Sequence, residues 1–299
     1  MQTTSRVFMV KPVKFGFNHQ TAANNAFQQR GFSDNVQENV LREFTSYTSL
    51  LRANGVDVVI AEDTESPHTP DSIFPNNWFS THEDGTLVLY PMYARNRREE
   101  RKAQFLEIIR KNFEVRRVVD LTWWENENLF LESTGSMILD RENRIVYACR
   151  SVRTSDEVLA DFCKQMGYAP VVFDASDRDG TAVYHTNVMM SVGTDYAILC
   201  TDAISDVQSR EKVIDTLKST GKKVMALTFD QLHDFAGNML ELRNNAGQKL
   251  LVMSATARKS LTPEQNKELS AHYRLLSPQL DYIEKNGGGS ARCMLAELF

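Results

Sequence analysis

Apolar and polar positions along the chain repeat one order of elements several times. In each unit two apolar, alternating segments predict a pair of strands, an amphipathic stretch predicts a helix, and a short apolar run predicts another strand. The predicted helices cover residues 39–55, 97–112, 155–167, 206–221 and 262–273. A repeat of about 50 residues is typical of rings or arrays in which every unit packs against its neighbours.

Residues suited to catalysis recur at one position of this repeat. The predicted first strands carry Asn77, Glu132, His185 and Asn238 at intervals of 55, 53 and 53 residues, and Cys293 follows 55 residues later. If the units surround an axis, equivalent positions face one another, which places Glu132, His185 and Cys293 in one central pocket. Equal intervals also fit simple duplication of a structural unit, and this alternative stays open for Asn238.

The segment NGGGSARCMLAELF places three glycines, residues 287–289, four residues ahead of Cys293. Chain ends usually fray, but consecutive glycines permit a sharp and sterically open approach to other segments. Residues 296–299 can then pair as a final strand that closes the ring beside the first unit. This arrangement predicts that Cys293 is held near the axis.

A thiol, an imidazole and a carboxylate in one pocket are the groups needed for nucleophilic catalysis. The thiolate attacks, the histidine transfers protons, and the acid orients the histidine or holds the substrate. Taken singly, a buried cysteine is commonly inert and a strand histidine is commonly structural, so the shared repeat position carries the interpretation. The chain order Glu132, His185, Cys293 argues against a papain-type protease, in which the cysteine comes first.

Composition and charge narrow the class of protein further. The 299 residues are 42% hydrophobic and 24% charged, with a formal net charge of −5, which predicts a large folded core. Scattered basic residues argue against a nucleic-acid partner. No apolar run approaches the roughly 18 residues of a membrane span, and we see no signal peptide, so we expect no membrane partner and a cytoplasmic location. The four widely spaced cysteines predict free thiols and no zinc site.

Seven motifs carry a resemblance to a known superfamily over nearly the whole chain. They are MVKPVKFGFN (9–18), PDSIFPNNWFSTH (70–82), RNRREER (95–101), FLESTGSMILDR (130–141), SVRT (151–154), VYHTNVMM (183–190) and GGGSARCM (287–294). In this order they resemble the guanidino-group modifying enzymes, or penteins, which include arginine deiminases, dimethylarginine dimethylaminohydrolases, agmatine deiminases and amidinotransferases. The chain is most similar to the bacterial amidinotransferase-like branch associated with citrulline utilisation.

The resemblance implies an α/β fold, a five-bladed ββαβ propeller with pseudo-fivefold symmetry, in which residues 1–299 form a single catalytic domain. By motif position it implies Cys293 as the nucleophile and His185 as the general acid and base. It implies Glu132 as the carboxylate that contacts the nitrogens of the substrate. No metal and no organic cofactor is implied, since the thiol supplies covalent catalysis by itself.

The resemblance also implies a set of substrate-binding residues. The arginine of the SVRT motif, Arg153, binds the substrate's carboxylate in relatives, and Arg97 often helps, a task that suits the bidentate guanidinium group. For Arg97 the alternative is the solvated face of the predicted helix 97–112. Asp71 either holds the substrate's α-amino group or caps a turn. Phe74, in the same motif (70–82), is a further expected substrate-binding residue.

One departure from the superfamily's pattern bears on the substrate. Arginine-directed relatives place a carboxylate after the PDxxF segment, where this chain has Asn76 and Asn77. An amide both donates and accepts hydrogen bonds without charge, so it suits the neutral ureido group of citrulline, whose C=O needs a donor. The same reasoning covers Asn187, where deiminases commonly carry aspartate.

We therefore expect a cysteine-dependent hydrolase that converts L-citrulline, or a close ureido compound, to ornithine, carbon dioxide and ammonia. The alternatives are a guanidino-group hydrolase and an amidinotransferase, both acting on arginine or a derivative. A non-catalytic binding module is the remaining alternative, but such a protein has no reason to keep the three catalytic groups together. The expected partner is a small ureido or guanidino amino acid, and the oligomeric state, including a homo-oligomer, stays open.

Overall fold

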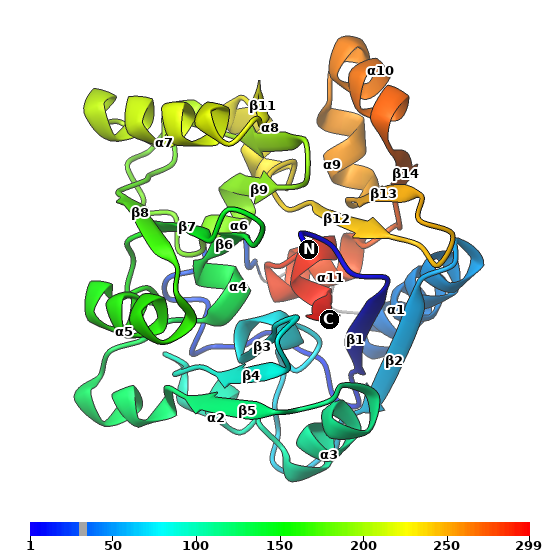
Figure 1. Cartoon of the computed structure of the whole chain (residues 1–299). Helices are drawn as coiled ribbons and strands as arrows, with labels where there is room; N and C mark the ends of the chain where they lie inside the picture. The colour runs from blue at the N-terminus through cyan, green and yellow to red at the C-terminus, as the bar shows by residue number, and fades with distance from the viewer. Residues whose placement is uncertain (30–34) are drawn as a thin grey trace.

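Five three-stranded sheets form the framework of the structure, a computed structural model that describes residues 1–29 and 35–299. Within these residues the middle strand of every sheet pairs with one antiparallel and one parallel neighbour. The sheets surround a common centre in Figure 1, which confirms the α/β class and fits a pseudo-fivefold arrangement. In sheet order the strands are β3 (Phe79–Thr81), β4 (Thr86–Leu89) and β5 (Arg117–Asp120); β6 (Ile138–Asp140), β7 (Ile145–Cys149) and β8 (Ala169–Phe173); β9 (Met190–Val192), β10 (Tyr196–Leu199) and β11 (Lys223–Ala226); β12 (Leu240–Arg243), β13 (Lys249–Val252) and β14 (Arg274–Leu276); and β15 (Ala296–Leu298), β1 (Arg6–Lys11) and β2 (Asp57–Glu62).

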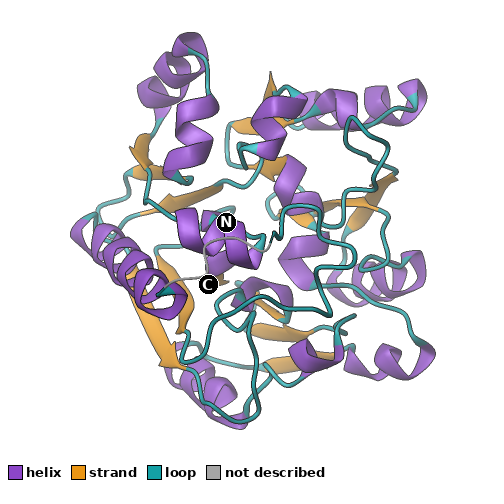
Figure 2. Ribbon diagram, turned by 180° about the vertical axis from the view of Figure 1, so that it is seen from behind, coloured by secondary structure: helices purple, strands orange, loops and turns teal. Residues whose placement is uncertain are grey.

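A helical connection joins the middle strand of each sheet to its parallel neighbour and lies on the outside of the ring (Figures 1 and 2). In α1, Val40, Phe44, Tyr47 and Leu51 recur at helical spacing and are all buried, so this face packs on the core. The longer helices are α1 (Val36–Ala53), α3 (Ala103–Asn112), α5 (Asp156–Met166), α7 (Val207–Ser219) and α10 (Pro263–His272). Shorter ones are α2 (Arg95–Arg98), α4 (Ser133–Ser136), α6 (Thr186–Met189), α8 (Phe229–His233), α9 (Ala255–Ser260), α11 (Asp281–Gly287) and the 3-10 turns η1 (Pro75–Asn77), η2 (Thr122–Glu127), η3 (Thr201–Ala203) and η4 (Ala291–Met294).

The fifth sheet joins the two ends of the chain, as the sequence predicted. Strand β15 pairs antiparallel with β1, with Arg6 opposite Leu298. The glycine run ends α11, and Gly288 adopts a left-handed φ of 65° at a point where a Cβ atom would lie 2.7 Å from the backbone nitrogen of Gln28. A side chain at this position would collide with that backbone, so the glycine permits the close approach. Cys293 follows in η4 and is 3% exposed.

The residues that the spacing singled out lie on turns that precede the first strands. The prediction that they lie on the strands themselves is wrong: Asn77 ends η1, Glu132 and His185 come directly before α4 and α6, and Asn238 precedes β12. A strand points alternate side chains to opposite faces, whereas a short turn at its inner end directs side chains toward the centre. Both η1 and α6 pack against α4, and η4 packs against η1, so these turns meet there.

The helix predicted over residues 97–112 is divided into α2 and α3. The charged residues between them do not all face solvent: Glu99 is exposed, but Glu100 is fully buried, and Arg101 and Lys102 are half-buried. Arg97 is 2% exposed and pairs with the fully buried Glu100, and the ammonium group of Lys102 binds Asp63. These partners hold Lys102 in an extended conformation, which interrupts the helix.

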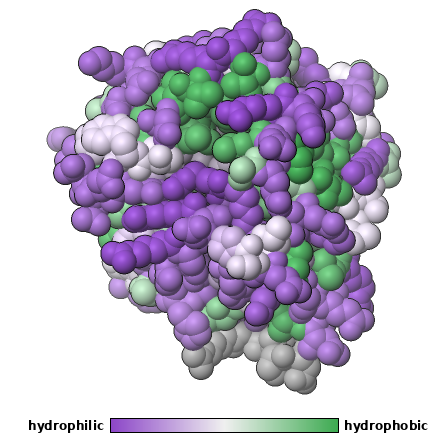
Figure 3. Space-filling model, turned by 90° about the horizontal axis from the view of Figure 1, so that it is seen from below, coloured by the Kyte–Doolittle hydropathy of each residue, from purple (hydrophilic) through white to green (hydrophobic). Residues whose placement is uncertain are grey.

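Hydrophilic side chains predominate on the face drawn in Figure 3, with hydrophobic groups between them. Among the described residues, no helix combines the length and the apolar composition that crossing a membrane requires.

Candidate active site

The three residues expected to carry the chemistry come together at the centre of the ring. The Nε2 atom of His185 lies 2.8 Å from Oε2 of Glu132, and His185 and Cys293 line the same cavity. All three side chains are at most 3% exposed. The cavity has a volume of about 10 Å³, which is about the space that one water molecule needs. The site is therefore closed in this conformation, and their catalytic roles stay predictions.

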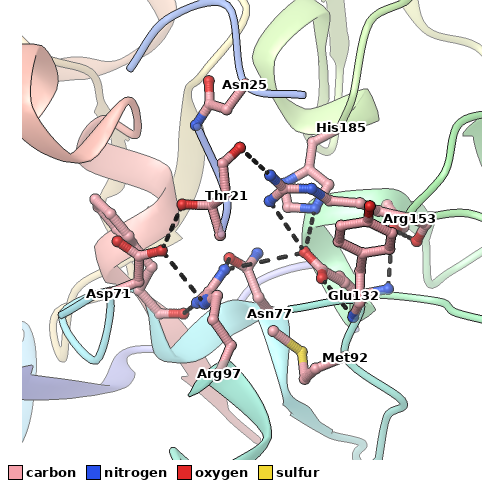
Figure 4. Close-up of polar contacts among 12 residues, drawn as sticks. Thr21, Asn25, Asp71, Asn77, Met92, Arg97, Glu132, Arg153 and His185 are labelled. Carbon is pink, nitrogen blue, oxygen red and sulfur yellow. Dashed lines mark hydrogen bonds and ion pairs between the residues drawn. The ribbon is translucent and has the colours of Figure 1, made fainter. Parts of the chain in front are cut away.

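Positive groups and a backbone amide surround the carboxylate of Glu132 (Figure 4). One oxygen lies 3.4 Å from Nη1 of Arg153 and 3.9 Å from Nη1 of Arg97, and the other accepts from the backbone N–H of Tyr93. Burial by itself would raise the pKa of Glu132, but the guanidinium charge of Arg153, the hydrogen bond from His185 and the charge of Arg97 outweigh it and hold the pKa well below its usual range. The carboxylate is therefore ionised whenever the protein is folded near neutral pH.

The imidazole of His185 is kept neutral at physiological pH. Burial lowers its pKa to about 4; Glu132 opposes this change, and the two arginines reinforce it. In the neutral ring, Nε2–H donates to Glu132, which leaves Nδ1 as the proton acceptor. The carboxylate thus selects the tautomer in which a basic nitrogen is available for catalysis.

This shift predicts the pH dependence of activity. Because the pKa of His185 is lowered and only the neutral ring accepts a proton, the acidic limb of kcat/KM is expected near pH 4 rather than near pH 6.5. The folded state also binds this proton less readily than the unfolded chain, so stability is retained above about pH 6.5 and lost as the pH falls toward 4. A kcat/KM profile from pH 3.5 to 8, with thermal melts at each pH, measures both effects. Half-maximal activity at pH 6 to 7 would contradict the assignment.

Arg97 makes four hydrogen bonds to protein groups, one of them to the side chain of Asn77. Its guanidinium binds both oxygens of Glu100, donates to the carbonyl of Phe74, and donates from Nη1 to Oδ1 of Asn77 at 2.8 Å. The opposite orientation of the amide would point N–H groups at the guanidinium, so Arg97 fixes the amide of Asn77. The Nδ2 of Asn77 is buried and has no partner. These contacts favour an orienting role for Arg97 over a direct contact with a substrate carboxylate.

Arg153 is held by the segment between β1 and α1. Its guanidinium donates to Oδ1 of Asn24 and to the carbonyl of Thr21, and it lies over the ring of Tyr184 at 4.8 Å. Since Arg153 is 1% exposed and lines the cavity, a substrate carboxylate reaches it only by replacing these oxygen atoms.

Asp71 and Phe74 also line the cavity. One oxygen of Asp71 accepts from Asn18 and Thr21, and the other is buried without a partner. Burial raises the pKa of Asp71, and the charge of Arg97 opposes this change. Phe74 contacts the glycine run, where a Cβ at Gly287 or Gly289 would lie within 3 Å of its ring. The aromatic ring thus packs against the glycine run that precedes Cys293.

Asn76 and Asn187 lie at the centre but are not among the cavity-lining residues. Asn76 is paired with Thr134 through both its side-chain nitrogen and its backbone carbonyl, while its Oδ1 has no partner. Asn187 donates from Nδ2 to the sulfur of Cys293 at 3.5 Å. The structure therefore places Asn187 beside the sulfur of Cys293 and pairs Asn76 with Thr134.

Several residues of the site were not assigned from the sequence. Asn238 donates to the sulfur of Cys293 at 3.2 Å, and the equal spacing of the repeat was the signal that pointed to it. Tyr184 lines the cavity next to His185, inside a motif that was already recognised. Thr21 and Asn25 line it from the segment after β1, where no periodic pattern indicates a site.

Gly135 offers a test of the packing at the centre. A Cβ atom at this position would lie 2.4 Å from Nδ2 of Asn77 and 2.9 Å from Nδ1 of His185. Gly135→Ala is therefore expected to displace both groups and to lower kcat/KM by about 100-fold, since small misplacements are costly in catalysis. The control is Gly16→Ala, because no atom lies within 4 Å of the added methyl group. Equal kcat/KM values for the two variants would contradict the described packing.

Among the described residues, no group of three histidine, cysteine, aspartate or glutamate side chains is arranged to hold a metal ion. Each described cysteine is a free thiol.

The fold and the site define a class of protein, the penteins that modify guanidino groups, a superfamily of hydrolases and amidinotransferases. The model of the family "N,N dimethylarginine dimethylhydrolase, eukaryotic" matches residues 11–299, and the chain belongs to this family. A search of curated proteins finds no match.

Solved structures with the same fold include ArgZ, described as an arginine dihydrolase of the ornithine-ammonia cycle in cyanobacteria. The apo structure of ArgZ has a TM-score of 0.77 and 17% identity, over 98% of this chain and 40% of that chain. The chain thus spans less than half the length of full ArgZ, whereas it covers 97% of the substrate-bound N-terminal domain, at 16% identity and a TM-score of 0.77. A dimethylarginine dimethylaminohydrolase adduct with S-methyl-L-thiocitrulline has a TM-score of 0.67 and 14% identity, over 99% of this chain and all of that chain. Identities this low establish the fold alone.

Proposed function

We propose that residues 1–299 act as a single catalytic domain that hydrolyses the ureido C–N bond of L-citrulline, giving ornithine, carbon dioxide and ammonia. One observation carries the choice of substrate: Arg97 holds the oxygen of Asn77 at 2.8 Å, so the amide offers the cavity a donor and no acceptor. A ureido oxygen accepts this hydrogen bond. A guanidinium group carries only donors and leaves the buried Nδ2 unpaired, which is costly.

In the first chemical step the sulfur of Cys293 attacks the ureido carbon. The thiol proton passes to Nδ1 of His185 and from there to the δ-nitrogen of the substrate as the C–N bond breaks. Ornithine leaves, and the enzyme retains an S-carbamoyl group on Cys293. Asn77 donates to the oxygen atom on which negative charge develops, a contribution that preorganised donors make to many acyl-transfer reactions.

In the second step a water molecule gives a proton to His185, and its oxygen adds to the carbonyl carbon of the S-carbamoyl group. The C–S bond breaks, the proton returns to the sulfur, and the released carbamic acid decomposes to carbon dioxide and ammonia. The ionised Glu132 stabilises the transient imidazolium in both steps through the 2.8 Å contact.

The amino acid end of the substrate is assigned to Asp71 and Arg153. The unpartnered oxygen of Asp71 suits an α-ammonium group, and Arg153 suits an α-carboxylate once the oxygens of Asn24 and Thr21 are displaced. Because the closed cavity has room for about one water molecule, its lining segments must separate to admit the substrate.

Arginine is the second candidate substrate. It is favoured by the family's description and by the arginine dihydrolase activity named for ArgZ. Carboxylate acceptors for a guanidinium group are present at Asp71, which lines the cavity, and at Glu132, which contacts His185.

A substrate panel distinguishes the two candidates. Citrulline, arginine, dimethylarginine, agmatine and N-carbamoylputrescine are each incubated with the protein, and ornithine, citrulline and ammonia are quantified. The proposal expects one ornithine and one ammonia per citrulline, without need for an acceptor amine. Turnover of arginine to citrulline, with citrulline itself inert, would overturn it. Dependence of turnover on an added amine indicates an amidinotransferase.

A further inference from the structure

Two amide groups donate to the sulfur of Cys293. The Nδ2 of Asn238 lies 3.2 Å from Sγ, and the Nδ2 of Asn187 lies 3.5 Å from it. Both asparagines are fully buried. Donors of this kind interact weakly with a neutral thiol and far more strongly with a thiolate, since hydrogen bonds to ions are about twice as strong.

The orientation of the amide of Asn238 is fixed by its remaining contacts. Its Oδ1 accepts from the backbone N–H of Arg292 at 3.0 Å, and its Nδ2 also donates to the backbone carbonyl of Asn187 at 2.8 Å. The amide cannot turn its oxygen toward the sulfur without losing both bonds. Asn238 is therefore a preorganised donor, which stabilises charge without a reorganisation cost.

Three titratable side chains near the sulfur carry no charge at neutral pH, whereas Arg97 and Arg153 line the same cavity. His185 is neutral near pH 7, because burial lowers its pKa to about 4. Burial raises the pKa of Tyr47 and Tyr184, so both are neutral phenols. The guanidinium of Arg292 interacts electrostatically with Cys293, and its hydrogen bonds go to the carbonyl of Leu295 and to Glu297 at 3.2 Å.

The charge of the substrate decides whether the two amide donors are needed. A guanidinium substrate brings a positive charge that favours the thiolate, whereas a ureido substrate is neutral and brings none. We propose that Asn187 and Asn238 form a donor pair that stabilises the thiolate of Cys293 and supplies what a cationic substrate would otherwise provide. The need for the pair rests on the proposed function, while the contacts of the two amides with the sulfur do not.

The pair acts in the step in which the S–H bond breaks. The proton moves to Nδ1 of His185, the electron pair stays on the sulfur, and the two amide N–H groups take up the developing charge. When the thiolate attacks the ureido carbon, this charge moves to the substrate oxygen and the donors are released.

The rate of alkylation of Cys293 by iodoacetamide, measured from pH 5 to 10 without substrate, tests the pair. Asn187→Ala removes an amide whose side chain makes a single hydrogen bond among the described residues, the one to the sulfur, so this variant is expected to fold. Asn238→Ala removes the closer donor together with two other bonds, and its melting temperature is measured alongside. Each variant is expected to raise the apparent thiolate pKa by about one unit, a tenfold loss of rate at pH 7 with an unchanged plateau at high pH.

Two control variants show whether the change in alkylation rate comes from the two amide donors. The Cys293→Ala protein gives the background from the other thiols, and Asn286→Ala removes a buried amide that donates to the carbonyl of Tyr282 and not to the sulfur. Profiles of Asn187→Ala and Asn238→Ala that coincide with the wild-type profile would overturn the proposal, as would a loss confined to the high-pH plateau. Because no substrate is present, a protein that hydrolyses arginine rather than citrulline leaves this result intact.

Discussion

Replacing Cys293 with alanine is expected to abolish citrulline hydrolysis, with a fall in kcat of at least about 1,000-fold. Among the described residues, Cys293 supplies the only thiol that lines the cavity together with His185, and without it no S-carbamoyl intermediate can form. Ornithine release under saturating citrulline measures the effect. Residual activity above a few per cent would remove the covalent mechanism.

The remaining cysteines serve as controls for the loss of a thiol. Burial raises the pKa of Cys149 to about 12 and that of Cys163 to about 11, and both pack in apolar clusters. Cys200 is also buried. Replacing any of them with alanine is expected to lower the melting temperature while kcat stays within about twofold, because the cost is one of core packing. Circular dichroism and melting of Cys293→Ala verify that its inactivity does not come from unfolding.

Asn77→Asp is expected to lower kcat/KM for citrulline by about 100-fold, the loss typical of removing one donor to an oxyanion. The carboxylate keeps the contact with Arg97 but has no N–H group for the ureido oxygen. It also adds a negative charge near the substrate, so arginine is expected to gain turnover. Initial rates with both substrates, measured on the same preparation, give the change in preference.

A second substitution separates the effect of charge from the loss of the donor. Asn77→Ala removes the donor without adding a carboxylate, so it is expected to weaken citrulline turnover and leave arginine unused. If neither kcat/KM changes in Asn77→Asp, the amide does not discriminate between ureido and guanidino groups, and the substrate assignment fails with it.

Much of the centre was predictable because it follows the repeat. Glu132 and His185 lie 53 residues apart, and they meet because equivalent turns of neighbouring sheets face the same axis. The same period places Asn238 beside Cys293. When equivalent units surround one axis, residues separated by one repeat length lie close in space. These pairs could therefore be predicted from the sequence.

The contacts that the sequence did not predict involve residues outside the repeated positions. The contact between Arg97 and Asn77 depends on the break between α2 and α3. The run of charged residues did not indicate this break, because buried ion pairs and a solvated helix face have the same composition. The contacts of Thr21 and Asn24 with Arg153 come from an irregular segment, whose path depends on what it packs against. Both require tertiary structure, because the determining partners lie far away in the sequence.

The pairing of β1 with β15 has a consequence for how activity appears during refolding. Arg6 and Leu298 are neighbours in the sheet, so the chain must bring together segments from opposite ends before η4 is held in place. Contacts this distant in sequence form late and slowly. After dilution from denaturant, the rate of ornithine production should therefore recover with the slowest spectroscopic phase of refolding. The recovery of enzyme activity then reports when β1 and β15 have paired.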